Sequence, residues 1–504
     1  MASLPGGSFP PALDALEQEN LVETIKDWSI ANGLAVRPPP AIAGSDPEGI
    51  LAINAPVTLF PSPFPKACFT QAKAIQQAYN ELYANISRDE VFLSALVQEV
   101  AGGDDFIANL WDLHLRVKKE GYVQNLSLGL FRSDYMVHHD SEGLQIKQVE
   151  FNTIASSFGG LSSQTSALHK HLATTEYTLL QNPGPVSNLD LPNNNSTAGL
   201  AAGLKTAYDA YGPSPRGHPT CVIFLVQDGE RNIFDQRHLE YALTRSGIPV
   251  FRLPFSHILA RTSVPASDPL RPLLYHPLHN PSLTFEVAVT YLRAGYGPSD
   301  YPSPSAWEAR YHIEHSRTIA CPSILTQLAG MKKVQQVLAT PGSSTLERFL
   351  SDPASLAAVR RTFTNIFALD DTPAGLEARK LATDPKACQR YVMKPQREGG
   401  GNNFYRGAIP ERLRTIPESH WGAHILMELI TPPPVANVIL RNGKLEQGGV
   451  ICELGVFGTC LWDRNGTAFL HNEESGYLLR TKGDQSEEGG VAAGYGCMDS
   501  VALV

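Results

Sequence analysis

The fold is most strongly indicated by the stretch Lys394-Pro395-Gln396-Arg397-Glu398-Gly399-Gly400-Gly401-Asn402-Asn403. Three adjacent glycines let the backbone turn freely and bring its N–H groups close to an anion. Lys394 supplies a cation for phosphate, and Glu398 supplies a hard oxygen ligand that suits Mg²⁺. No Gly-Lys-Ser/Thr follows the glycines, so the stretch is not a Walker A loop. The alternative interpretation is a flexible surface loop between two strands.

Short strand patterns surround this loop, at residues 391–394, 425–430 and 449–454. Within residues 459–470, the tetrad Asp463-Arg464-Asn465-Gly466 is a strong signal for a hairpin turn. These patterns predict an antiparallel sheet, with helices over about 328–382 beside it.

Residues 219–330 have a different pattern of predicted secondary structure. Strand patterns at 220–226, 249–253 and 285–292 alternate with helical patterns at 233–245 and 307–319. Such alternation predicts a parallel sheet with helices packed on it. We therefore expect a separate α/β domain here.

The N-terminal region has helical spacing over 12–31 and 71–97, separated by proline-rich connectors. The Pro, Asn and Ser content of residues 183–196 indicates a loop at a domain boundary. The predicted fold class is α+β and α/β. The predicted parts are 1–218, 219–330 and 331–504.

A second motif is Val149-Glu150-Phe151-Asn152-Thr153, at the end of a strand expected over 145–151. Strand side chains alternate, so Val149 and Phe151 should share one face, and Glu150 and Asn152 the other. Two oxygen-bearing side chains near Gly159-Gly160 could hold a metal bound to nucleotide phosphates. The alternative is an exposed strand face with ordinary polar residues.

A third motif is Arg480-Thr481-Lys482, followed by the small-residue stretch Glu487-Glu488-Gly489-Gly490-Val491-Ala492-Ala493-Gly494. Small residues suit a mobile lid that closes over a substrate and excludes water. The alternative is a disordered tail.

Composition excludes several function classes. The 504 residues carry a formal net charge of -9, which gives no general attraction for nucleic acid or anionic lipid. The first residues lack a signal-peptide pattern, and no apolar run is long enough for a membrane span, so we expect a cytoplasmic protein. The seven cysteines are scattered without a Cys-x-x-Cys pair, which argues against a disulfide framework or a zinc site.

Two metal-ligand candidates, several lysines and arginines, and glycine-rich loops together indicate phosphoryl transfer. The protein-kinase motifs Val-Ala-Ile-Lys and His-Arg-Asp do not occur. Five stretches, in family order, resemble eukaryotic glutathione synthetases: Glu150-Phe151-Asn152-Thr153-Ile154, Glu230-Arg231-Asn232-Ile233-Phe234-Asp235-Gln236, residues 327–336, residues 394–403, and residues 478–482 with 489–494.

This resemblance implies an ATP-grasp fold with an inserted α/β substrate domain, in a homodimer. It implies a ligase that joins γ-glutamylcysteine to glycine, with ATP as cosubstrate and Mg²⁺ as cofactor. The dipeptide carboxylate would attack the γ-phosphate to give an acyl phosphate and ADP. The glycine amine would then displace phosphate.

The resemblance also implies roles for individual residues. The metal ligands would be Glu150, Asn152 and Glu398, and the catalytic set would be Arg132, Lys332, Lys394 and Arg480. The ATP site would comprise Asn152, Lys332, Lys394, Glu398, Gly399, Gly400, Gly401, Asn402, Asn403, Tyr405, Met427, Glu428, Leu429, Ile430, Glu453, Lys482 and Glu488. The substrates would contact Arg132, Ala155, Ser156, Ser157, Glu230, Asn232, Gln236, Arg293, Tyr296, Arg480, Val491 and Ala492.

The chemistry of the side chains supports these substrate-binding roles. A guanidinium offers a planar, bidentate fork for carboxylates, and Glu230 can accept an ammonium group. Glu230 could instead be a surface acid at the start of a helix. Two positions depart from the family pattern, since Ala294 replaces an aspartate and Ala155 a serine, both expected near the dipeptide.

Two alternatives for the function follow. The first keeps the chemistry but uses another amine, such as β-alanine or serine. The second is a nucleotide-binding regulatory protein without catalysis, which predicts eroded metal ligands. Glu150, Asn152 and Glu398 are all present.

Overall fold

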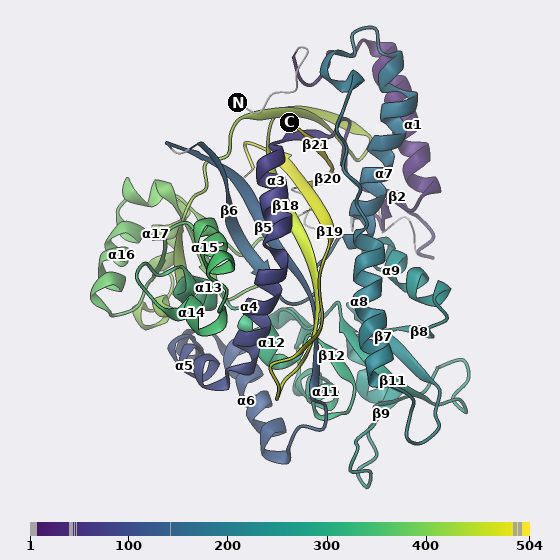
Figure 1. Cartoon of the computed structure of the whole chain (residues 1–504), viewed down its shortest axis with the longest axis vertical. Helices are drawn as coiled ribbons and strands as arrows, with labels where there is room; N and C mark the ends of the chain where they lie inside the picture. The colour runs from purple at the N-terminus through teal and green to yellow at the C-terminus, as the bar shows by residue number, and fades with distance from the viewer. Residues whose placement is uncertain are drawn as a thin grey trace.

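The computed structural model describes residues 8–39, 44, 46, 48–141, 143–486, 491 and 496–504, which form a mixed α+β fold. A seven-stranded, mostly antiparallel sheet runs through the middle of the molecule (Figure 1). In spatial order its strands are β17 (Val435–Arg441), β3 (Val57–Thr58), β20 (Cys497–Asp499), β19 (Phe469–Gly483), β18 (Lys444–Asp463), β5 (Leu126–Asp140) and β6 (Gly143–Asn152).

Helices cover both faces of this sheet. Alternate side chains of β18 point to opposite faces, so Cys460 and Trp462 join one apolar cluster while Phe457 and Leu461 join another. The first cluster includes residues of α4 (Gln76–Arg88), and the second includes residues of α7 (Gly159–Thr175) and α8 (Ser196–Tyr211).

The helices predicted near the N-terminus are present, with different limits. The pattern over 71–97 divides into α3 (Lys66–Ala74), α4 and α5 (Glu90–Val100), and α6 (Asp105–Glu120) follows; α1 spans Ala15–Ala31. Asp89 causes the second division, because its side chain accepts the N–H of Phe92 and so caps α5. No helix of the described residues is both long and apolar enough to cross a bilayer.

The parallel sheet predicted within 219–330 is confirmed. Strands β8 (Val250–Pro254), β7 (Thr220–Val226), β11 (Phe285–Leu292) and β12 (Ile319–Cys321) pair in parallel, and β10 (Leu274–Tyr275) and β9 (Thr262–Ser263) extend the sheet. Helix α9 spans Ile233–Arg245. The helix expected over 307–319 is instead α11 (Pro304–His315), because Ile319 pairs with β11 and begins β12.

The antiparallel strands predicted for the C-terminal part belong to two sheets. Strands β13 (Ile366–Ala368), β16 (His424–Glu428), β14 (Tyr391–Pro395) and β15 (Phe404–Tyr405) form a smaller sheet, whereas residues 449–454 and 459–463 lie in β18 of the central sheet. The hairpin turn is confirmed, since β18 ends at Asp463 and pairs with β19. Nearby helices are α12 (Ile324–Ala329), α13 (Lys332–Ala339), α14 (Thr345–Phe349), α15 (Pro353–Thr362), α16 (Pro373–Thr383) and α17 (Ala408–Leu413).

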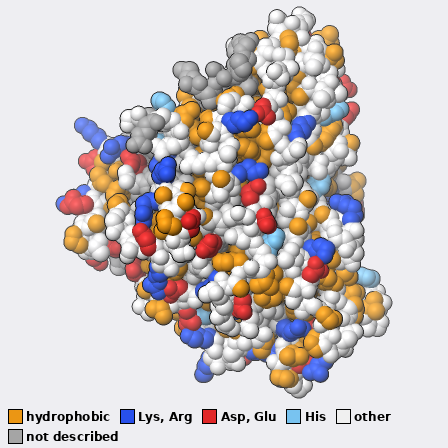
Figure 2. Space-filling model, viewed as in Figure 1, with side chains coloured by type: hydrophobic (Ala, Val, Ile, Leu, Met, Phe, Trp, Pro, Cys, Tyr) orange, Lys and Arg blue, Asp and Glu red, His pale blue; other side chains and the backbone are white. Residues whose placement is uncertain are grey.

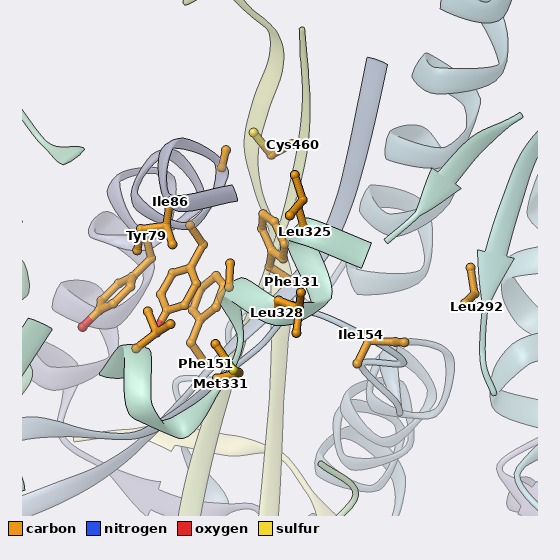
Figure 3. Packing of buried hydrophobic residues seen from close by; sticks show 14 of the residues in the cluster. Tyr79, Ile86, Phe131, Phe151, Ile154, Leu292, Leu325, Leu328, Met331 and Cys460 are labelled. Atoms are coloured by element: carbon orange, nitrogen blue, oxygen red, sulfur yellow. The ribbon is translucent and has the colours of Figure 1, made fainter. Parts of the chain in front are cut away.

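A β-bulge corrects the predicted faces of β6. Asp134 pairs with Glu150, but Tyr135 pairs with Gln148, so Val149 is an extra residue. Phe151 packs in the core, where its ring stacks on Tyr83 with centroids 3.8 Å apart; Figure 3 shows Phe151 among Phe131, Leu328 and Met331. Val149 instead lines a cavity together with Glu150 and Asn152. The prediction that Val149 and Phe151 share a face was therefore wrong.

Charged side chains of both signs are interspersed on the face of the molecule in Figure 2. All seven cysteines are free, and six of them are buried.

Candidate active site

A cavity of about 770 Å³ is lined by residues of the central sheet, of the four-stranded sheet and of the segments that follow β7 and β11 of the parallel sheet. Most predicted site residues line it, namely Arg132, Glu150, Asn152, Ala155, Ser156, Ser157, Glu230, Asn232, Arg293, Tyr296, Lys394, Glu398, Gly399, Gly400, Asn402, Asn403, Tyr405, Met427, Glu428, Leu429, Ile430, Glu453, Arg480, Lys482 and Val491. Lys332, Gly401 and Gln236 do not line it. Glu488 and Ala492 lie outside the described residues.

The acidic candidates for metal binding converge on one buried amine. The Nζ atom of Lys332, at the start of α13, lies 3.0 Å from Glu150 Oε2 and 3.1 Å from Glu398 Oε1. Only 3% of the Lys332 side chain is exposed. Glu398 Oε2 is also buried, and it has no hydrogen-bond partner among the described residues. Two carboxylates and an unpartnered oxygen beside one cation indicate room for more positive charge.

The pKa values of these groups follow from burial and charge. Burial opposes the ionisation of Glu150, but Lys332, Lys394 and Arg480 together hold its pKa below the usual range. Burial raises the pKa of Glu398 to about 7, against the opposing effect of Lys332. Burial disfavours the charge of Lys332, yet the two glutamates raise its pKa. Burial therefore opposes the charge of Glu398 more than that of Glu150, although both side chains face the ammonium group of Lys332.

The glycine-rich loop continues from β14. Lys394 is buried and its Nζ donates to the carbonyl of Val149 at 2.8 Å, which ties the loop to β6. Gly399, Gly400 and Gly401 all have positive φ angles, of 93°, 70° and 74°, so the loop needs residues without a Cβ. A Cβ at Gly399 would lie 3.1 Å from Cε2 of Tyr296. The loop therefore lies against a residue that follows the parallel sheet.

One end of the cavity is apolar. Val392 on β14 pairs with Met427 on β16 and with Tyr405 on β15, and all three residues line the cavity. Leu429 and Ile430 pack against the same small cluster. A slot lined by these apolar side chains suits a nucleotide base.

Two arginines line the cavity on the central sheet. Arg132 on β5 donates from Nε to Asp134 at 2.6 Å and from an NH group to the carbonyl of Ser157 at 3.1 Å. Arg480 on β19 donates to Asp134 at 3.0 Å and also to Glu453, its cross-strand neighbour on β18. Burial opposes the charge of Arg480, but Glu453 and Asp134 raise its pKa, so the guanidinium stays charged.

The opposite end of the cavity has buried polar atoms without partners. Arg293, which follows β11, donates to the carbonyl of Ser156 at 2.8 Å and to Ser157 Oγ at 2.7 Å. Arg293 Nε, Ser156 Oγ, Asn232 Oδ1 and Gln236 Oε1 find no hydrogen-bond partner within the described part of the chain. Buried polar groups are normally satisfied, so the atoms of the three residues that line the cavity, Arg293, Ser156 and Asn232, indicate a polar ligand.

Glu230 belongs to this end of the cavity and also helps to start α9. Its carboxylate accepts the N–H of Asn232 at 2.8 Å and the side-chain amide of Gln236 at 2.6 Å. Gln236 is buried behind Glu230, which explains why it does not line the cavity. The surface-acid interpretation of Glu230 does not account for its place in the cavity wall.

A carboxylate from α9 holds the turn between β6 and α7. Asp235 is buried and accepts the backbone N–H groups of Phe158 at 2.7 Å, Gly160 at 2.7 Å and Leu161 at 3.2 Å. Phe158 has φ of 74° and gives α7 no side-chain cap, so Asp235 supplies the cap from another element. Ala155, in the same turn, has φ of 51°. The turn that lines the cavity is therefore held by a distant residue.

Ala294 lies between Arg293 and Tyr296, which line the cavity, but its own side chain does not. It is fully buried in an apolar cluster with Phe255, Leu292 and Tyr301, and it does not line the cavity. Asp300 instead accepts the N–H groups of the next two residues, Gly295 at 2.9 Å and Tyr296 at 3.1 Å.

Ala294→Asp should therefore destabilise the protein instead of improving dipeptide binding. Placing a carboxyl group among apolar side chains without a partner costs roughly 2 kcal/mol or more. Urea unfolding should give a lower midpoint for Ala294→Asp than for the uncharged control Ala294→Ser. A lowered KM for the dipeptide at unchanged stability would contradict the buried position.

Some cavity residues received no site role from the sequence, although Val149, Ile154 and Arg397 stand within the quoted motifs. They are Met136, Val149, Ile154, Phe158, Gln227, Gln389, Arg390, Val392, Arg397, Arg406, Thr431, Pro432, Ile451, Asp484, Gln485 and Ser486. Asp134 and Asp235 were also missed, although each holds several predicted site residues. For Asp134 a signal existed, because strand alternation places it on the same face as Arg132. For Asp235 the role depends on tertiary contacts alone.

Comparison with known proteins gives consistent results. Residues 15–503 match the family model described as "Eukaryotic glutathione synthase, ATP binding domain". The chain is 39% identical to the glutathione synthetase large chain of Schizosaccharomyces pombe, covering 96% of this chain and 97% of that protein. It is 39% identical to glutathione synthetase of Homo sapiens, with 97% of each chain covered. The structure resembles a glutathione synthetase-like effector of Globodera pallida, with a TM-score of 0.74, 22% identity and 98% of each chain covered, which supports the same fold.

Proposed function

Because the chain belongs to the eukaryotic glutathione synthase family, we propose that its cavity is where ATP, γ-glutamylcysteine and glycine react. The protein is an ATP-dependent ligase of glutathione synthesis. The observation that carries the site proposal is the convergence of Glu150 and Glu398, which both line the cavity, on the buried amine of Lys332. We further propose that the four-stranded sheet and the central sheet together form an ATP-grasp fold around the nucleotide.

Glu150, Asn152 and Glu398 are proposed to hold Mg²⁺. Their oxygen donors are of the hard type that Mg²⁺ prefers, and Glu398 Oε2 is a buried oxygen without a partner among the described residues. Asn152 donates its Nδ2 to Asp134 at 2.9 Å, which leaves its Oδ1 as the ligating atom. When bound, Mg²⁺ would neutralise charge on the triphosphate.

The apolar slot of Met427, Leu429 and Ile430 is proposed to take the adenine. Lys332 and Lys394 would contact phosphates, with Gly399 to Asn403 and Tyr405 over the nucleotide. Glu428, Glu453, Lys482 and Glu488 would complete this site. A buried lysine is strongly attracted to phosphate because few waters screen its charge.

The dipeptide is proposed to lie at the other end, against Arg132, Arg293, Tyr296, Asn232 and the turn 155–157. Its ammonium group would lie at Glu230, which Gln236 supports from behind. Its carboxylate oxygen attacks the γ-phosphorus and ADP leaves. The glycine amine then attacks the acyl carbon, phosphate leaves with the former carboxylate oxygen, and the amine loses a proton. Arg480, Val491 and Ala492 would hold the carboxylate ends of the substrates. The chain acts by positioning and electrostatics, with no covalent step of its own.

Several further proposals come from the sequence patterns and, for the homodimer, from the family resemblance. They are a homodimer, a cytoplasmic location, lid function for the glycine-rich and alanine-rich loops, and the division into parts 1–218, 219–330 and 331–504.

ADP release tests the reaction directly. With γ-glutamylcysteine, ATP and Mg²⁺ present, glycine should give sustained ADP release, while β-alanine or serine in its place should give little. Without an amine, release should stop near one ADP per site, because the acyl phosphate has no acceptor. Sustained release with another amine alone, or none with any, would contradict the proposal.

A further inference from the structure

Asp134 connects three residues to which the proposed function gives different tasks. On β5, it accepts Arg132 at 2.6 and 2.8 Å, Arg480 at 3.0 Å and Asn152 at 2.9 Å. Its side chain is 0% exposed and it does not line the cavity. Asp134 therefore cannot reach a substrate itself, but it touches two candidate carboxylate-binding arginines and a candidate metal ligand.

Each contact controls which atom faces the cavity. An aspartate carboxylate only accepts hydrogen bonds, so Asn152 must present Nδ2 to it and keep its oxygen for the cavity. Arg132 gives Nε and one terminal nitrogen to Asp134, and its other terminal nitrogen donates to Ser157. This bidentate pairing sets the plane of the guanidinium group.

The neighbouring strand β18 has a glycine where the Arg132–Asp134 pair needs space. Gly455 on β18 stands opposite Asp134. A Cβ there would lie 2.7 Å from Arg132 Cδ and 2.8 Å from Asp134 Oδ1, closer than real contacts allow. The glycine thus leaves the space that the Arg132–Asp134 pair occupies.

We propose that Asp134 is a positioning residue that orients Arg132, Arg480 and the amide of Asn152 together, and so couples peptide binding to metal binding. The proposal rests on the proposed function of those three residues. Its consequence is that one change, away from every substrate, disturbs two affinities at once while the adenine slot, built from β14 and β16, stays as it is.

Asp134→Asn tests this coupling. The asparagine amide has one acceptor oxygen instead of two, so it breaks the bidentate pairing with Arg132 and can no longer serve Arg132, Arg480 and Asn152 together. Asn152 Nδ2 then keeps the carbonyl of Arg132, at 3.2 Å, as its acceptor. We expect the KM for γ-glutamylcysteine and the Mg²⁺ concentration for half-maximal rate to rise at least tenfold. The Kd for ADP measured without Mg²⁺ should stay within twofold. Dipeptide KM and Mg²⁺ dependence both within twofold of wild type, in a folded variant, would overturn the proposal.

Glu286→Gln is the matched control. Glu286 is equally buried and accepts Arg317 at 2.9 Å, but it lies in the parallel sheet and does not line the cavity. It should lose stability without moving KM or Mg²⁺ dependence; equal shifts in this control would overturn the specific role of Asp134.

If Asp134→Asn does not fold, Gly455→Ala provides a second test. Its added methyl group disturbs the Arg132–Asp134 pair from the neighbouring strand β18. Unchanged affinities in folded Gly455→Ala would then overturn the proposal. Calorimetric binding of the dipeptide needs no turnover. Wild type that binds dipeptide but releases no ADP would contradict the proposed reaction, while the loss of binding in the variants would still report on Asp134.

Discussion

Glu398→Ala should lower turnover at least a hundredfold, which corresponds to about 3 kcal/mol of transition-state stabilisation. Glu398 lies 3.1 Å from the amine of Lys332, opposite Glu150, and contributes a buried oxygen without a partner among the described residues. Its removal takes away one proposed metal ligand and leaves Lys332 paired with Glu150 alone. The rate should be measured as ADP release at saturating substrates and with Mg²⁺ raised stepwise.

Two variants sharpen this result. Glu398→Gln keeps the shape and one oxygen, so its rate should lie between those of wild type and Glu398→Ala. Glu377→Ala removes a carboxylate that is 69% exposed and should leave turnover unchanged. A near-normal rate for Glu398→Ala at all Mg²⁺ concentrations would remove Glu398 from the metal site.

Asp235→Ala should destabilise the protein by about 3–5 kcal/mol, because it leaves a buried arginine without its counter-charge. The guanidinium of Arg293 lies 3.8 Å from Asp235, and both side chains are only 4% exposed. The same change leaves the N–H groups of Phe158, Gly160 and Leu161 without their acceptor. The urea midpoint should fall, and the KM for the dipeptide should rise in the protein that remains folded.

The controls separate charge from shape. Asp235→Asn retains an acceptor oxygen and should lose less stability than Asp235→Ala. Asp209→Ala removes a 55%-exposed partner of Lys205 and should change stability by less than about 1 kcal/mol. If Asp235→Ala were as stable as Asp209→Ala, the turn between β6 and α7 would not depend on Asp235.

Local patterns predicted much of the fold. The apolar run of β7 and the turn at residues 463–466 were recognisable because burial and turn chemistry leave short-range signals. The division of C-terminal strands between two sheets was not predictable, since residues 391–394, 425–430 and 449–454 are similar short apolar stretches and only strand pairing assigns the last of them to the long β18. Likewise, Ile319 was placed in a helix because only pairing with Val289 of β11 identifies it as a strand residue.

The candidate site was predicted unevenly. The triple glycine at 399–401 has a backbone requirement that is visible in sequence, and the structure gives all three residues positive φ angles. The bulge at Val149 leaves no such signal, because it depends on how β6 pairs with β5. Asp235 looks like an ordinary acid in the sequence, since its importance comes from Phe158, Gly160 and Leu161, which lie 74 to 77 positions away.

The hydrogen bonds from the start of α7 to Asp235 restrict which segments can be exchanged between relatives. Gly160 lies so close to α9 that a Cβ there would be 2.3 Å from the backbone oxygen of Asp235. If residues 220–321 are replaced by those of a relative, the donor segment must therefore have an acid at position 235. The recipient must have a glycine at position 160. Chimeras that match only one side of this junction would misalign the recipient's peptide pocket even if both pieces fold.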